Sequence, residues 1–178
     1  SICAGNAETF TITVNPSPEM DNVEDVVLCN NEISSIIEFT TPKTDGNTTY
    51  TWTNDNTSIG LSSTGNGDIP SFTALNLSPI TEVATITVTP TYENNGVVCI
   101  GDPQTFSISV LSEIEITGTT VDALDCNDPN SGNINITVTG GSGVYDFLWS
   151  NGAITEDLNN IGPGDYSVTV TDSEGCTA

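Results

Sequence analysis

The residues of this chain that could do chemistry are its cysteines and its carboxylates. The cysteines are five in number and widely spaced: Cys3, Cys29, Cys99, Cys126 and Cys176. None belongs to a CxxC pair and the chain has no histidine, so a zinc site is not expected. Widely spaced cysteines in small β domains usually form disulfides in an oxidising compartment. We therefore expect covalent cross-links.

The spacing of cysteine and tryptophan indicates how the cross-links could be arranged. Cys29 precedes Trp52 by 23 residues, and Cys126 precedes Trp149 by the same 23. Each stretch then ends in a further cysteine, in the Cys…Trp…Cys order typical of immunoglobulin-like domains. In such domains the tryptophan packs against the bridge, so we expect Trp52 and Trp149 to be core residues.

Two disulfides follow from this order. We expect Cys29 to pair with Cys99 and Cys126 with Cys176, each closing a long loop. Connectivity is not fixed by sequence, and pairing of Cys3 with Cys29 stays open if neighbouring domains interlock. Otherwise Cys3, which aligns with Cys99 in the repeat described below, would be left unpaired, its partner lying upstream of this chain.

The carboxylates suggest a second kind of chemistry, the binding of calcium. Asp122, Asp125 and Asp128 lie together, and Asp172 and Glu174 lie beside Cys176. A bond between Cys126 and Cys176 would bring the two groups together, and Ca²⁺ prefers six to eight oxygen ligands. No EF-hand pattern is complete. The same carboxylates also suit turns on an acidic surface, and this alternative stays open.

Composition argues against several functions. Without histidine no Ser-His or Cys-His pair can form, and nothing marks out one carboxylate pair, so we do not expect an enzyme. One Lys or Arg against 24 Asp and Glu gives a net charge of −23, which repels nucleic acid and anionic lipid. No stretch approaches the roughly 20 apolar residues of a membrane helix, so membrane insertion is not expected.

The elements that must position these residues are strands. Alternation of apolar with polar residues has a period of two, which predicts strands near residues 10–14, 36–39, 85–89, 134–138 and 166–170. Clusters of Gly, Asn, Asp and Pro separate them as turns. Helical periodicity is nearly absent, so the expected fold class is all-β.

An internal repeat predicts how the strands are divided into domains. Residues 2–14 (ICAGNAETFTITV) return without a gap as residues 98–110 (VCIGDPQTFSISV), an offset of 96 residues. That offset is about the size of one immunoglobulin-like sandwich, ~100 residues. We therefore predict a linear array of tandem β-sandwiches: residues 1–15 as the last strand of a preceding domain, 16–111 as one sandwich, and 112–178 as a second sandwich that lacks its final strand.

Two runs in the second predicted domain resemble a known family. GGSGVYDFLWSNGAITEDL at residues 140–158 and GDYSVTVTDSEGCT at residues 164–177 resemble the SprB repeat of large surface adhesins from gliding Bacteroidetes. In the first predicted domain, YTWTND at residues 50–55, GNGDIPSF at 65–72 and ATITVTP at 84–90 resemble the PKD-like repeats of the same proteins.

The resemblance implies a function that composition cannot give. It implies export by the type IX secretion system, display on the outer surface of a bacterial cell, and a part in gliding motility and attachment. The implied partners are further repeats of the same chain, an external surface or polysaccharide, and the gliding and secretion machinery, reached through other parts of the parent protein. The alternative is a polysaccharide-binding accessory module of a secreted protein, which requires exposed aromatic rings.

Overall fold

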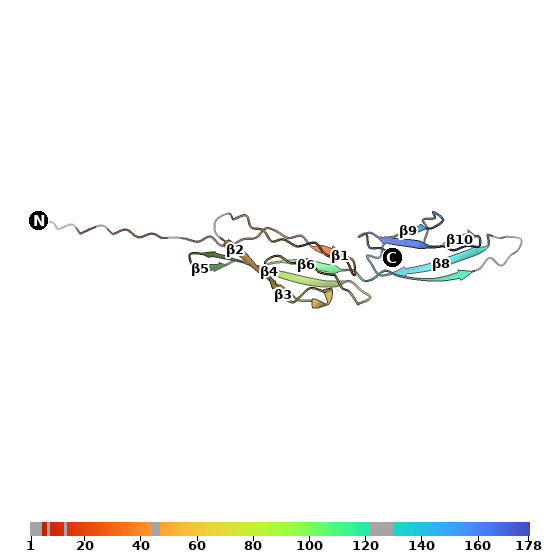
Figure 1. Ribbon diagram of the computed structural model, residues 1–178, viewed down its shortest axis with the longest axis horizontal. Helices are drawn as coiled ribbons and strands as arrows, with labels where there is room; N and C mark the ends of the chain where they lie inside the picture. Colours follow the sequence, from red (N-terminus) through yellow and green to blue (C-terminus); the bar gives the residue numbers. More distant parts are fainter. Residues whose placement is uncertain (1–4, 7, 13, 44–46, 122–129) are drawn as a thin grey trace.

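The structure is a computed structural model that describes residues 5–6, 8–12, 14–43, 47–121 and 130–178. Its secondary structure is eleven strands and a single short 3-10 helix within these ranges, so the all-β prediction is confirmed. The strands form three sheets, and the buried residues form two separate hydrophobic cores. The two cores lie end to end along the long axis of the molecule (Figure 1).

The first core is built on one large sheet. Its strands are β1 (Val26–Leu28), β2 (Asn47–Asn54), β3 (Thr64–Asn66), β4 (Glu82–Asn94), β5 (Val97–Ile100) and β6 (Gln104–Val110). The order is β1-β6-β4-β2-β3, and β5 pairs with the far end of β4. The β1–β6 pair is parallel and the other pairs are antiparallel, and the 3-10 helix η1 (Thr57–Ile59) follows β2.

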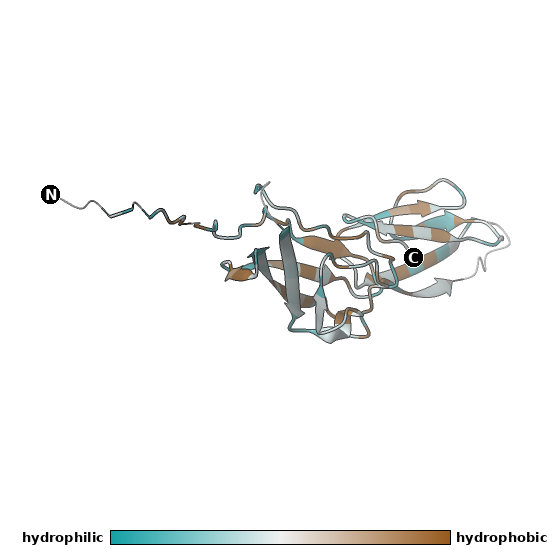
Figure 2. Ribbon diagram, turned by 60° about the vertical axis from the view of Figure 1, so that its left-hand side comes forward, coloured by the Kyte–Doolittle hydropathy of each residue, from teal (hydrophilic) through white to brown (hydrophobic). Residues whose placement is uncertain are grey.

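Alternation with a period of two explains why these segments are strands. In β4, Ala84, Ile86 and Val88 are fully buried, while the residues between them point outward. Their partners on β6 across the ladder include Ile108 and Phe106, which are also buried. The buried residues of β4 therefore share one face of the strand. Figure 2 shows hydrophobic bands alternating with paler bands along the strands.

The layer that covers this sheet is largely irregular. Ile37 forms an isolated bridge with Ile69, and Ile33 forms one with Thr73, so the strand predicted at residues 36–39 is wrong. The backbone N–H of Phe39 donates instead to the Asp68 carboxylate at 2.8 Å. Side chains replace ladder partners here, yet Phe39 is still buried against the first core.

The second core lies between two small sheets. One contains β7 (Glu115–Val121), β8 (Gly132–Thr139) and β10 (Leu158–Ile161) in the order β10-β8-β7. The other pairs β9 (Tyr145–Trp149) with β11 (Val168–Asp172), and all pairs are antiparallel. The core between them is small, with Val170 fully buried.

The first described residues of the chain do not join either unit. Residues 8–12 and 14 form no strand and extend away from the first sheet (Figure 1). Phe10, Ile12 and Val14 are 84%, 75% and 84% exposed. The strand predicted here is therefore absent from the described part of this segment. The matching segment in the sequence repeat is β6, where neighbouring strands are present and Phe106 and Ile108 are buried.

Candidate functional site

The joint between the two cores is where the predicted chemistry and the structure meet. A short linker, residues 111–114, leads from β6 to β7, and its ends Leu111 and Ile114 are both buried. The Leu111 N–H donates to the carbonyl of Leu28 at 2.9 Å, and the Gly141 N–H donates to the carbonyl of Ser112 at 3.0 Å. The linker is therefore hydrogen-bonded to both units.

Gly140 shows how closely the linker packs on the second unit. Its φ is +87°, a conformation that favours glycine, and a Cβ there would collide with the carbonyl of Glu113. The glycine cluster at residues 140–143 predicts a turn here. The sequence does not predict the contact with the linker, because a Gly-rich turn does not indicate which segment packs against it.

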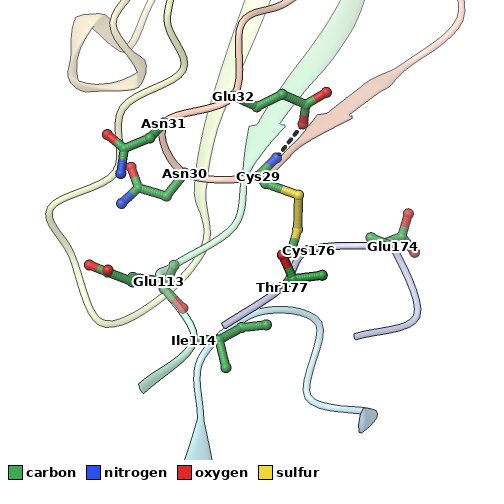
Figure 3. Close-up of a pocket in the computed structure, with 11 residues that line it drawn as sticks. Cys29, Asn30, Asn31, Glu32, Glu113, Ile114, Glu174, Cys176 and Thr177 are labelled. Carbon is green, nitrogen blue, oxygen red and sulfur yellow. Dashed lines mark hydrogen bonds between the residues drawn. A yellow bond between two sulfur atoms is a disulfide. The ribbon is translucent and has the colours of Figure 1, made fainter. Parts of the chain in front are cut away.

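A disulfide spans the joint. Cys29, directly after β1, is bonded to Cys176, four residues after β11, with their Cα atoms 5.6 Å apart. Figure 3 shows the bond beside the linker residues Glu113 and Ile114. The bond links the first unit to the second instead of closing either one.

This bond corrects both predicted pairings, Cys29 with Cys99 and Cys126 with Cys176. Cys99 carries a free thiol and is partly exposed on β5. Cys3 and Cys126 lie outside the described residues. The alternative pairing of Cys3 with Cys29 is also ruled out, since Cys29 is already bonded.

The physical reason for the correction is the length of β4. Cys99 lies opposite Tyr92 of β4, whereas the Cys29 end of β1 lies beside Val110, which pairs with Glu82 at the other end of that strand. At ~3.4 Å per residue the ten residues from Glu82 to Tyr92 span about 34 Å, whereas a disulfide needs Cα atoms within roughly 7 Å. The Cys…Trp…Cys order in the sequence gives no information about this distance between the cysteines.

Asp172 holds the turn that places Cys176. Asp172 is 4% exposed, and its Oδ1 accepts from the N–H groups of Glu174 at 3.0 Å and Cys176 at 2.9 Å. Its Oδ2 accepts from the N–H of Ser142 at 2.8 Å. The N–H of Asp172 donates in turn to the carbonyl of Cys176 at 2.9 Å. Three donors therefore occupy this carboxylate.

Acidic side chains also line a shallow pocket beside the disulfide, among them Glu32, Glu113 and Glu174 (Figure 3). The Glu32 carboxylate accepts from the N–H of Cys29 at 2.8 Å. Within the described residues, no group of three or more acidic or cysteine side chains is arranged to hold a metal ion. Asp122, Asp125 and Asp128 lie outside those residues, so calcium binding stays a prediction.

Both tryptophans lie inside the two units. Trp52 and Trp149 are each 4% exposed. The Trp52 ring lies against Gly65, its partner on β3, with no space for a Cβ there. The indole N–H of Trp149 donates to the carbonyl of Thr155 at 2.7 Å. Neither ring is available for stacking on a sugar.

Three groups away from the joint have shifted pKa values. The N–H of Ser107 donates to the carboxylate of Asp25 at 2.7 Å, which lowers the pKa of Asp25. The side chain of Asn56 lowers the pKa of Glu82 in the same way. Burial raises the pKa of Tyr50. The Asp25 bond lies directly ahead of β1, where it continues the contact between β1 and β6.

The structure defines the class of the protein as an all-β chain with immunoglobulin-like sheets, built of two cores that share one cross-linked joint. The comparisons are more specific for one part of it. Residues 117–154 match the family model of the SprB repeat, a span that begins in β7 and ends beyond β9. The comparison with curated proteins finds no matching relative. No helix in the described ranges is long and apolar enough to cross a membrane.

Proposed function

We propose that this chain is a stalk segment of a filamentous bacterial surface adhesin, used in gliding motility and attachment. The observation that carries the proposal is the SprB repeat at residues 117–154, in a molecule whose two cores lie end to end (Figure 1). In this role the chain is not an enzyme. It is exported by the type IX secretion system and displayed outside the cell, and it separates an adhesive region from the cell surface.

Three physical features support a spacer. The net charge of −23 keeps neighbouring filaments apart by repulsion. The linker of residues 111–114 is bonded to both units, which limits bending at the joint. Burial of Trp52 and Trp149 removes the aromatic platform that a polysaccharide-binding module would need. Residues 16–111 fit the role of a PKD-like unit in the array. Partners then reach the filament through other parts of the parent protein.

Binding experiments test the proposal. The purified chain is applied to a glycan array and to glass and polystyrene surfaces, with calcium and then with a chelator, after circular dichroism has shown that it is folded. A spacer is expected to bind none of them above a control protein of similar acidity. Binding by the folded chain would make these repeats the adhesive element and overturn the spacer role.

The calcium arm also tests the predicted metal site. If the acidic groups around Asp125 and Glu174 bind Ca²⁺, the melting temperature should rise with calcium and return with chelator. Magnesium at the same concentration is the matched control, because it keeps its waters more tightly and demands a stricter octahedral geometry. An identical melting temperature in all three conditions would remove calcium from the proposal.

A further inference from the structure

The cross-link divides the chain into a closed loop and two tails. Cys29 and Cys176 are 147 residues apart in sequence and are joined at the joint between the units. Every residue from 30 to 175 lies inside the loop that they close, which includes both cores except for β1 and the segment ahead of it. We propose that the Cys29–Cys176 disulfide carries tension across this segment and shields from it the parts of both cores that lie inside the loop.

The argument depends on connectivity. Tension that enters the chain before Cys29 and leaves it after Cys176 has two routes between these residues: the short route through the sulfur–sulfur bond and the long route through the loop. A covalent bond is far stiffer than a folded sheet held by hydrogen bonds. The sulfur–sulfur bond therefore bears the tension, and the loop of residues 30–175 is not stretched.

The positions of the strands fit this route. On one side of the bond β1 is the strand outside the loop, held to β6 by three paired positions and by the bond from Leu111 to Leu28. The segment ahead of β1 also lies outside it, with Met20 buried in the first core. On the other side the chain turns back after β11, so that Cys176 and the C-terminus lie beside the joint (Figure 1). The second unit therefore projects beyond the bond as a side loop, with its sheets off the line of tension.

The consequence is a limit on extension. With the bond intact, only residues 1–29 and 176–178 can lengthen, which at ~0.35 nm per residue amounts to about 11 nm. With the bond broken, the 147-residue separation can also be drawn out, which adds about 50 nm. The proposed function supplies only the source of the tension, since the limit holds for any pull on the chain.

Single-molecule force spectroscopy tests the proposal. The full chain is held by peptide tags at its two ends, attached enzymatically so that no thiol is used, and is stretched first without and then with dithiothreitol. Without reductant the total lengthening should stay within about 11 nm. When reductant is added under constant force, steps should appear that sum to about 50 nm more.

Two variants complete the design. Cys29→Ser combined with Cys176→Ser should show the long extension without reductant, whereas Cys99→Ser, which removes the free thiol, should behave as the wild type. If the double variant fails to fold, it still exceeds the limit, and the oxidised wild type remains the deciding measurement. Lengthening of the oxidised wild type well beyond 11 nm would overturn the proposal, whatever the binding experiments show about the stalk.

Discussion

The position of the disulfide depends on Asp172, through its carboxylate. It is buried and accepts hydrogen bonds from three backbone N–H groups, one of which belongs to Cys176. A charged acceptor used in this way organises a turn without any metal ion. Asp172 is therefore a positioning residue for the bond across the joint.

Replacing Asp172 by alanine should destabilise the second unit. Asp172→Ala leaves three donors without their acceptor, so the free energy of unfolding should fall by about 2–4 kcal/mol. The thiol formed at Cys176 on reduction should also re-form the bond more slowly, because its turn is no longer fixed. Urea titration followed by circular dichroism measures the first effect, and the rate of reoxidation after removal of reductant measures the second.

The matched control is Asp146→Ala, an exposed aspartate on β9 opposite Thr171. It should change the free energy of unfolding by less than about 0.5 kcal/mol. Equal effects of the two substitutions would mean that Asp172 acts only through general charge and does not hold the turn.

At the residue scale, the sequence predicts which side chains are buried better than it predicts which residues bond to one another. Trp52 and Trp149 were expected in cores from their spacing, and both are buried. The disulfide partners could not be predicted, since β4 places Cys99 at the end of the sheet opposite Cys29. Asp172 was considered as a calcium ligand because sequence shows a carboxylate but not the N–H groups aimed at it.

At the scale of elements, residues 8–14 and the buried strand β6 have nearly the same sequence, although the described residues 8–12 and 14 are exposed. Phe106 and Ile108 are buried between β1 and β4, whereas Phe10 and Ile12 have no such neighbours. The same sequence pattern therefore forms a strand only where neighbouring strands can pair with it, because burial of its apolar face stabilises the strand. We expect residues 8–14 to complete a sheet of the same kind in a preceding unit.

A longer chain tests this expectation. A second copy of residues 16–103, with Cys29→Ser in the copy to prevent mispairing, is placed directly ahead of Glu8, so that residues 8–14 follow as β6 does. Their amides should become protected in hydrogen exchange by at least 100-fold, because they now pair with β1 and β4 of the copy.

In the present chain the amides of residues 8–12 and 14 should exchange at close to the rate of an unfolded peptide, since these residues form no strand. Phe10→Asp in the longer chain is the matched control and should abolish the protection, because a charge would enter the core. Fast exchange at residues 8–14 of the longer chain itself would contradict the idea that this segment is a displaced strand.

The strands themselves were the most predictable part of the fold. Period-two alternation identified β4, β8 and β11 because one face of each strand is less exposed than the other. It failed at residues 36–39, where the Asp68 side chain takes the place of a neighbouring strand. A short apolar run cannot reveal whether its backbone partners are another strand or a side chain.

At the scale of the whole molecule, one disulfide joins the two units covalently. The linker, the contact at Gly140 and the disulfide all act at the same joint. The acidic surface suits a filament, and the matched SprB repeat lies in the second unit, inside the loop that the disulfide closes. The central claim is therefore that the cross-link lies between the units and not within them.

Peptide mapping by mass spectrometry tests that claim most directly. The oxidised, folded protein is alkylated at free thiols and then cleaved at Asp and Glu, since one Lys or Arg gives trypsin almost nowhere to cut. We predict a disulfide-linked pair of peptides that contain Cys29 and Cys176, and an alkylated Cys99. A linked pair of Cys29 with Cys99, or of Cys126 with Cys176, would contradict both the joint described here and the proposed route of tension.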